Sequence, residues 1–233
     1  SVASAASVDT ASPDATITGS PAQTPGSAGT ARPVTPSPSP VDETTRQVER
    51  LLTERSGALA AGDPAAWAAT VHDPASAQGA REIAAYQGLQ ALGVRSLTVS
   101  DIRTLAPMAG DPPGVLTASV RLGYRIPGFD RADRVLTRTV SVAETAGRWR
   151  IVRWLGAGDQ WEAFDLPGLQ VAHTTSVLVA GPVPTEELLA QLAAAETGQG
   201  QVADVLGRAT AAVVVVPTDD TEAAGLLGVA GSQ

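Results

Sequence analysis

Residues 114–156 carry the strongest pattern in this chain. In the range 116–126 apolar side chains occupy every second position, and mostly Thr, Ser and Arg stand between them. A period of two with one polar face is typical of a strand buried on one side. A β-branched run over 135–143 predicts a second strand, and the pair Ala146-Gly147 predicts a turn into a third over 148–154. The stretch therefore predicts a three-stranded antiparallel meander.

Helical spacing dominates the segment before the meander. Apolar residues recur at helical intervals after Asp42, which we expect to cap the first helix. Asp63-Pro64 predicts the N-terminus of a short second helix, in which Trp67 fills the gap to the first. A third helix is predicted over 77–92 and a strand over 95–105. Helices followed by long antiparallel strands predict an α+β fold.

Two local sequences resemble a known family. They are Leu59-Ala-Ala-Gly-Asp-Pro-Ala-Ala-Trp67 and Glu144-Thr-Ala-Gly-Arg-Trp-Arg-Ile-Val152. Because of these two stretches, residues 43–157 resemble the nuclear transport factor 2-like superfamily, which includes the ketosteroid-isomerase-like and SnoaL-like domains. The resemblance implies a cone-shaped, curved antiparallel sheet packed on helices, with a mouth that could hold a small apolar ligand. We assign this cone domain to residues 42–158.

Charge divides the chain at the end of this domain. Residues 1–159 contain 15 acidic residues and 15 arginines, whereas residues 160–233 contain nine acidic residues and Arg208 alone. Two charge regimes predict two structural units, the second over 159–233. Because neither half is basic, the sequence predicts no nucleic-acid partner.

The acidic unit is predicted to be a small α/β unit. We expect a strand over 169–179, a helix over 184–196 with Thr185 as its cap, a short helix over 202–206 and a final helix over 219–227. The apolar run 211–216 predicts a strand that is buried on both faces. This order resembles the front of a gluzincin peptidase-like domain that follows a cone domain in some secreted bacterial proteins. The stretches that carry this resemblance are 202–207, 212–217 and 222–228.

The first 41 residues predict a disordered tether. They are rich in Ser, Ala, Thr and Pro and poor in charge, so they cannot bury enough apolar surface to offset the entropy of ordering. Such a tether, starting at Ser1 and not at a methionine, leads us to expect export to the cell envelope or outside by a signal or lipid-anchor segment. No run of 18 apolar residues occurs, so membrane contact is expected only through such an anchor.

Metal and cofactor chemistry find little support in the sequence. The chain has no cysteine and two histidines, His72 and His173, neither with a His or Glu four residues away. A zinc hydrolase needs paired histidines on one helix face with a Glu beside them. We therefore predict no metal site and no cofactor.

Acid–base chemistry in the cone is the main enzymatic alternative. Members of the superfamily that are enzymes use a desolvated carboxylate or a His–Asp pair with a Tyr or acid beside it. The candidates are Tyr124, Asp101, Tyr86 and His72. Tyr124 is the strongest because it lies on the apolar side of its strand. The alternative is that Tyr124 is a core residue and Asp101 a solvated carboxylate.

Arginines concentrate on the meander strands, at positions 121, 125, 138, 148, 150 and 153. We consider Arg121, Arg125, Arg148, Arg150 and Arg153 candidates for an interface that holds the acidic unit. The alternative is that all six arginines, Arg138 included, cover the outer sheet face and pair with Asp130, Asp133 and Glu144. Trp149 and Trp154 are predicted on opposite faces, which makes Trp154 an interface candidate.

These observations favour an exported, envelope-tethered protein whose cone domain is a non-catalytic binding or assembly module. Its expected partners are a small apolar ligand in the cone, the chain's own acidic unit and, as an open alternative, a second copy. Two enzymatic alternatives remain: the N-terminal portion of a secreted zinc peptidase without its metal-binding helix, and a small-molecule acid–base enzyme.

Overall fold

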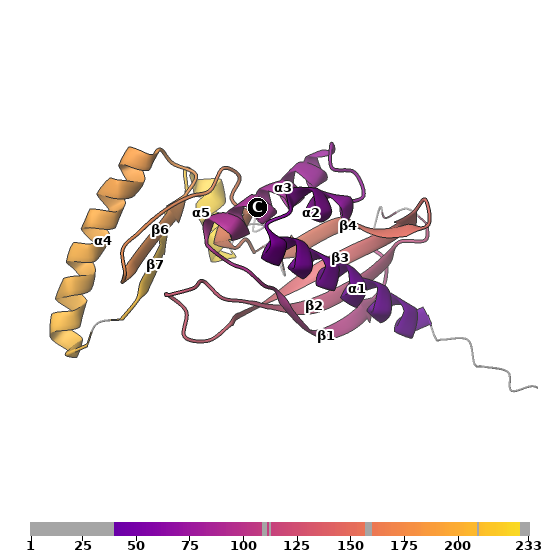
Figure 1. Ribbon diagram of the computed structural model, residues 1–233, viewed down its shortest axis with the longest axis horizontal. Helices are drawn as coiled ribbons and strands as arrows, with labels where there is room; N and C mark the ends of the chain where they lie inside the picture. Colours follow the sequence, from indigo (N-terminus) through magenta and orange to yellow (C-terminus); the bar gives the residue numbers. More distant parts are fainter. Residues whose placement is uncertain (1–39, 109–110, 112, 157–159, 209, 229–233) are drawn as a thin grey trace, which may run out of the picture. The chain divides into compact units, whose positions relative to one another are not determined.

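The computed structural model describes residues 40–108, 111, 113–156, 160–208 and 210–228, which form an α+β fold (Figure 1). The predicted tether lies outside the described residues up to position 39. In chain order the elements are α1 (Pro40–Ala61), α2 (Pro64–Ala69), α3 (Ala77–Ala91), β1 (Thr98–Leu105), β2 (Leu116–Tyr124), β3 (Arg134–Thr145), β4 (Arg148–Gly156), η2 (Ala163–Asp165), β5 (Gln170–His173), β6 (Val177–Gly181), α4 (Thr185–Leu206), β7 (Ala212–Val215) and α5 (Asp220–Leu227).

Strands β1–β4 form one antiparallel sheet in sequential order, in which β2–β4 are the predicted three-stranded meander. Leu122 pairs with Leu136 and Ala118 with Val140, so the apolar positions of β2 face the same side as those of β3. The predicted turn is present: Ala146 and Gly147 have φ angles of 53° and 74°, in the left-handed region that a tight hairpin turn requires.

The three N-terminal helices cover one face of this sheet (Figure 1). The side chain of Asp63 caps α2 by accepting hydrogen bonds from the amides of Ala65 and Ala66 at 2.9 Å, as predicted. Trp67 is buried, as expected, and its indole donates to the carbonyl oxygen of Glu82 at 3.0 Å. The first helix begins at Pro40, two residues before the expected cap.

Two bulges curve the sheet and change which side chains face inward. In β1, Asp101 adopts a φ of 52° where the register to β2 shifts. In β4 the register shifts after Ile151, so Val152 is an extra residue. The prediction that Trp149 and Trp154 lie on opposite faces is therefore wrong. Both pack against the cluster that contains Ile151, because the extra residue reverses the alternation between them.

The C-terminal elements form a second sheet in the order β5–β6–β7, with α4 packed on it (Figure 1). The segment predicted as one strand is an antiparallel hairpin, β5–β6. The two predicted helices are a single helix, α4, whose N-cap is Pro184 and not Thr185. Among the described strands, β7 pairs only with β6, in parallel, and it is only half-buried, so the expectation of burial on both faces is wrong.

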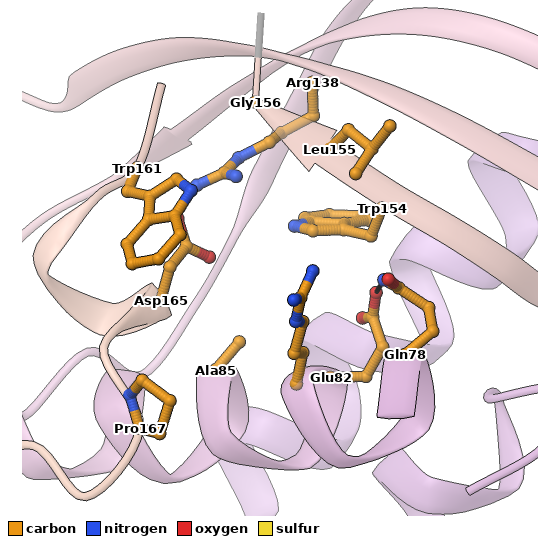
Figure 2. A pocket seen from close by; sticks show the side chains of 11 residues that line it. Gln78, Glu82, Ala85, Arg138, Trp154, Leu155, Gly156, Trp161, Asp165 and Pro167 are labelled. Atoms are coloured by element: carbon orange, nitrogen blue, oxygen red, sulfur yellow. Dashed lines mark hydrogen bonds and ion pairs between the residues drawn. The ribbon is translucent and has the colours of Figure 1, made fainter. Parts of the chain in front are cut away.

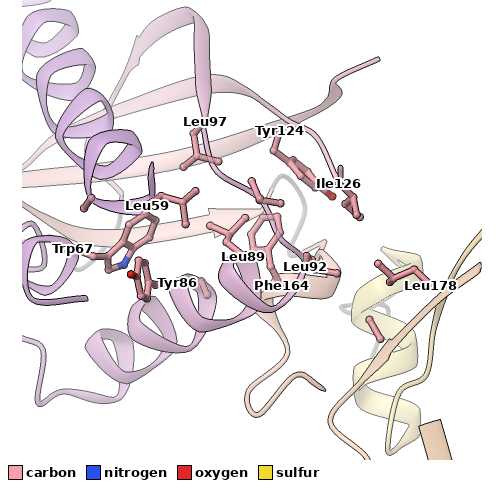
Figure 3. Packing of buried hydrophobic residues seen from close by; sticks show 14 residues of the cluster. Leu59, Trp67, Tyr86, Leu89, Leu92, Leu97, Tyr124, Ile126, Phe164 and Leu178 are labelled. Atoms are coloured by element: carbon pink, nitrogen blue, oxygen red, sulfur yellow. The ribbon is translucent and has the colours of Figure 1, made fainter. Parts of the chain in front are cut away.

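One buried cluster joins residues from both sheets. Leu178 and Ala180 of β6 belong to the same cluster as Leu92 at the end of α3 and Ile126 after β2 (Figure 3). Phe164, in the segment that connects the sheets, lies in it as well. None of the described helices is both long and apolar enough to cross a membrane.

Candidate functional site

The segment after β4 folds back and inserts a side chain into the cone. Glu162 and Asp165 form a capping box around η2, which fixes a tight turn with Phe164 at its centre. Phe164 is 3% exposed, and its ring meets Tyr124 edge to face at a centroid distance of 5.3 Å. Beside this ring the apolar interior keeps a cavity of only about 10 Å³. A side chain of the connecting segment therefore fills part of the apolar interior between α3 and the sheet.

A larger cavity, of about 310 Å³, opens next to this insertion (Figure 2). We call it the mouth pocket. It is lined by α3, by Arg138 of β3, by Trp154 and its neighbours at the end of β4, and by Trp161, Asp165 and Pro167 of the connecting segment. The pocket thus combines two tryptophans with charged side chains.

A fully buried ion pair lies behind the mouth pocket. Nη1 of Arg55 in α1 contacts Oε2 of Glu82 in α3 at 2.8 Å, and its Nε donates to the hydroxyl of Thr70 at 3.0 Å. The guanidinium also lies between the rings of Trp67 and Trp154, at 4.4 and 5.0 Å. Desolvation lowers the pKa of Arg55 and raises the pKa of Glu82, against their mutual attraction.

A second ion pair holds the connecting segment to the sheet. The guanidinium of Arg138, whose residue is 2% exposed, donates to Oδ2 of Asp165 and lies 5.3 Å from the ring of Phe164. The same Oδ2 accepts the amide of Glu162 at 2.8 Å. Arg138 therefore points inward, and grouping it with the outer arginines was wrong. Along β3, Arg138 occupies the same alternate positions as Val140 and Val142, whose side chains are completely buried.

The structure places the predicted acid–base candidates apart. Tyr124 is buried, as its strand pattern predicts, and its hydroxyl donates to Oε2 of Glu162 at 3.0 Å. Desolvation and the nearby Glu162 carboxylate raise the pKa of Tyr124 above its usual range. Tyr86 stacks near Trp67, whereas Asp101 pairs with Arg103 at the exposed bulge of β1. His72 is exposed, and its Nδ1 lies 2.9 Å from the hydroxyl of Thr145, the last residue of β3.

The interface candidates are distributed over the outer surface of the sheet. Arg125 pairs with Asp133 at 2.8 Å and Arg153 with Asp111 at 3.1 Å, both within the same domain. Within the described ranges, no ion pair joins Arg121, Arg125, Arg148, Arg150 or Arg153 to the acidic unit. The candidate Trp154 is only 8% exposed and belongs to the core.

In the part of the chain that the structure describes, no three His, Asp or Glu side chains come together as the ligands of a metal ion would. His173, the second histidine, lies on β5 with its ring 6.1 Å from that of Phe129.

Several residues of the site are not predicted by the sequence analysis, although two of them stand at positions where the sequence pattern indicates a buried charge. Arg55 falls on the apolar stripe of α1 and Arg138 on the inward parity of β3, so each was a charge at a core position that requires a partner. No such pattern marks Phe164 and Asp165, because they belong to an irregular segment whose path depends on the completed cone.

Comparisons with known proteins give a distant structural likeness. No family description and no curated protein matches the chain. Among solved structures, a protein of unknown function from Mycobacterium tuberculosis aligns at 14% identity with a TM-score of 0.37, over 50% of this chain and 73% of its own. A protein from Streptomyces avermitilis, described as a candidate dehydratase of the nuclear transport factor 2-like family, aligns at 14% identity with a TM-score of 0.35, over 48% of this chain and 94% of its own.

Proposed function

We propose that residues 42–158 form a nuclear transport factor 2-like domain that serves as a non-catalytic assembly module. The part that it binds is the chain's own connecting segment, residues 160–166, which carries the acidic unit. The observation behind this proposal is the burial of Phe164 against Tyr124 in the apolar interior of the cone. The cone then acts as a receptor for this side chain and leaves little of its interior to a substrate.

The polar groups around Phe164 support a binding role over an enzymatic one. A general acid or base needs a free side chain within reach of a substrate. The hydroxyl of Tyr124 instead donates to Glu162, and the carboxylate of Asp165 accepts from Arg138. Both interactions fasten the inserted segment, so we assign these four side chains to assembly.

Apolar contacts extend the attachment beyond the inserted ring. Leu178 and Ala180 of the second sheet share the cluster of Leu92 and Ile126, and Leu166 is completely buried. Full burial of one Leu or Phe side chain contributes about 1.5–3 kcal/mol. Together these side chains supply more free energy than surface arginines would, because exposed ion pairs contribute only about 0–1 kcal/mol each.

Phe164→Ala tests the assembly role, with Leu52→Ala as the matched control. Both remove a fully buried side chain and should destabilise the protein by about 2–5 kcal/mol. Leu52 is a residue of α1, and its side chain packs against the sheet in a different cluster. Limited proteolysis under native conditions should therefore cleave the chain within residues 157–168 much faster in Phe164→Ala than in the unmodified protein. Leu52→Ala should not show this increase. Equal cleavage in both variants would contradict the proposal.

Export and tethering belong to the same proposal and rest on the Ser/Ala/Pro-rich composition of residues 1–41. Fractionation of cells that express the complete gene should recover the protein with the envelope or the medium, and recovery with the cytosol would end this part. The peptidase-like alternative for residues 159–233 has its own test. A metal-binding H-E-x-x-H helix encoded past Gln233 would favour it.

A further inference from the structure

The mouth pocket presents hydrogen-bond donors that have no acceptor among the described residues. Trp154 and Trp161 lie on opposite sides of the pocket in Figure 2, and the indole nitrogen of Trp154 points into it. In the described part of the chain, the indole N–H of Trp67 has an acceptor, the carbonyl oxygen of Glu82, whereas those of Trp154 and Trp161 have none. An indole N–H can only donate, so both groups are free to donate to water or to an acceptor that enters the pocket.

The charges around the pocket also favour an acceptor. The two carboxylates that line it are already engaged, since Glu82 accepts from Arg55 and Gln78 and Asp165 accepts from Arg138. Arg81, which also lines the pocket, is exposed and has no ion-pair partner among the described residues. One positive charge is therefore left over at the pocket.

The size and walls of the pocket define the rest of the ligand. A volume of about 310 Å³ lies at the lower end of the range for small-molecule sites. Ala85 and Pro167, which lie below the indole rings in Figure 2, supply apolar wall. This space suits a flat, apolar body of one or two rings.

We propose that the mouth pocket binds a small carboxylate with a flat apolar body, such as an aromatic acid. The carboxylate accepts hydrogen bonds from Arg81 and from the indole N–H groups, and the ring lies against the tryptophans. This inference goes beyond the assembly role, because the ligand is a separate molecule in a cavity that Phe164 does not fill. The pocket has walls from both the cone and the connecting segment, so the ligand contacts both.

Titration of the full chain with three matched probes tests the charge of the ligand. Benzoate, neutral benzamide and cationic benzamidine share one ring and differ in their polar group. In ¹H–¹⁵N spectra, benzoate should move the indole N–H signals of Trp154 and Trp161 and leave that of Trp149, which lies outside the pocket. Benzoate should bind at least about tenfold more tightly than either other probe, the effect of one charge-assisted hydrogen bond.

Arg81→Gln tests the site, with Arg121→Gln as its control. Both arginines are exposed, but Arg121 lies on β2 and does not line the mouth pocket. Arg81→Gln should weaken benzoate binding at least about tenfold, and Arg121→Gln should leave it unchanged. Equal weakening in both variants, equal binding of benzamide, or unmoved Trp154 and Trp161 signals up to about 20 mM benzoate would each overturn the proposal. None of these results would bear on the cleavage test of Phe164→Ala.

Discussion

The connecting segment requires a glycine at position 88, because its backbone passes too close to α3 to leave room for a side chain there. Gly88 lies within α3, where a Cβ atom would stand 2.5 Å from the carbonyl oxygen and 2.7 Å from the Cα of Phe164. Backbone atoms cannot move aside as a flexible side chain can. Gly88→Ala should therefore push the segment out of the cone and destabilise the protein, although Ala favours a helix over Gly by about 1 kcal/mol. Urea unfolding measures the change.

Gly57 is the control for this experiment, because there is room for a side chain at its position. It lies within α1, and a Cβ atom there would meet nothing within 4 Å. Gly57→Ala should stabilise the protein by about 0.5–1 kcal/mol, because only the helix propensity changes. If both variants gained stability, the close approach of Phe164 to α3 would be wrong, and so would the insertion that depends on it.

At the scale of elements, the sequence predicts periodic structure well and its interruptions poorly. The alternation in β2 correctly placed Tyr124 inside, and the Asp63 cap correctly marked α2. The same alternation failed in β4, because Val152 is an extra residue that no composition signal announces. Arg138 shows a different failure, in which the parity was readable but a charged residue was assumed to face water.

The acidic unit shows how tertiary contacts override local signals. Gly198 and Gly200 favour an end to the preceding helix, yet α4 continues through both to Leu206. Gln199 contributes to this continuity, because its side chain binds Ser176 before β6 and the carbonyl oxygen of Thr210 before β7. These contacts join segments far apart in the sequence, so no local pattern could predict them. The candidate site follows the same rule, since Phe164 reaches it through a segment without periodicity.

At the scale of the whole molecule, the two sheets share one apolar cluster. Phe164, Leu178 and Ala180 come after the cone domain in the sequence but are buried with Tyr124 and Ile126. Separate charge regimes therefore do not exclude a shared cluster, although Val177, Val179 and Leu188 belong to a further cluster within the acidic unit. The acidic unit is attached through apolar side chains and through the buried pair of Arg138 with Asp165. Charge in this chain distinguishes surfaces, whereas apolar burial decides which parts assemble.

The shared cluster leads to a prediction about a fragment that ends at residue 158. The fragment keeps all four strands of the first sheet to Gly156 but loses Phe164 and Leu166, so we expect a native-like far-UV spectrum and a stability lower by several kcal/mol. The vacated cone should bind an apolar dye that the full chain does not bind. A synthetic peptide of residues 160–168 should displace the dye, whereas the same peptide with Phe164→Ala should not. A fragment as stable as the full chain and unable to bind dye would refute the shared core, because the cone would then be complete without Phe164.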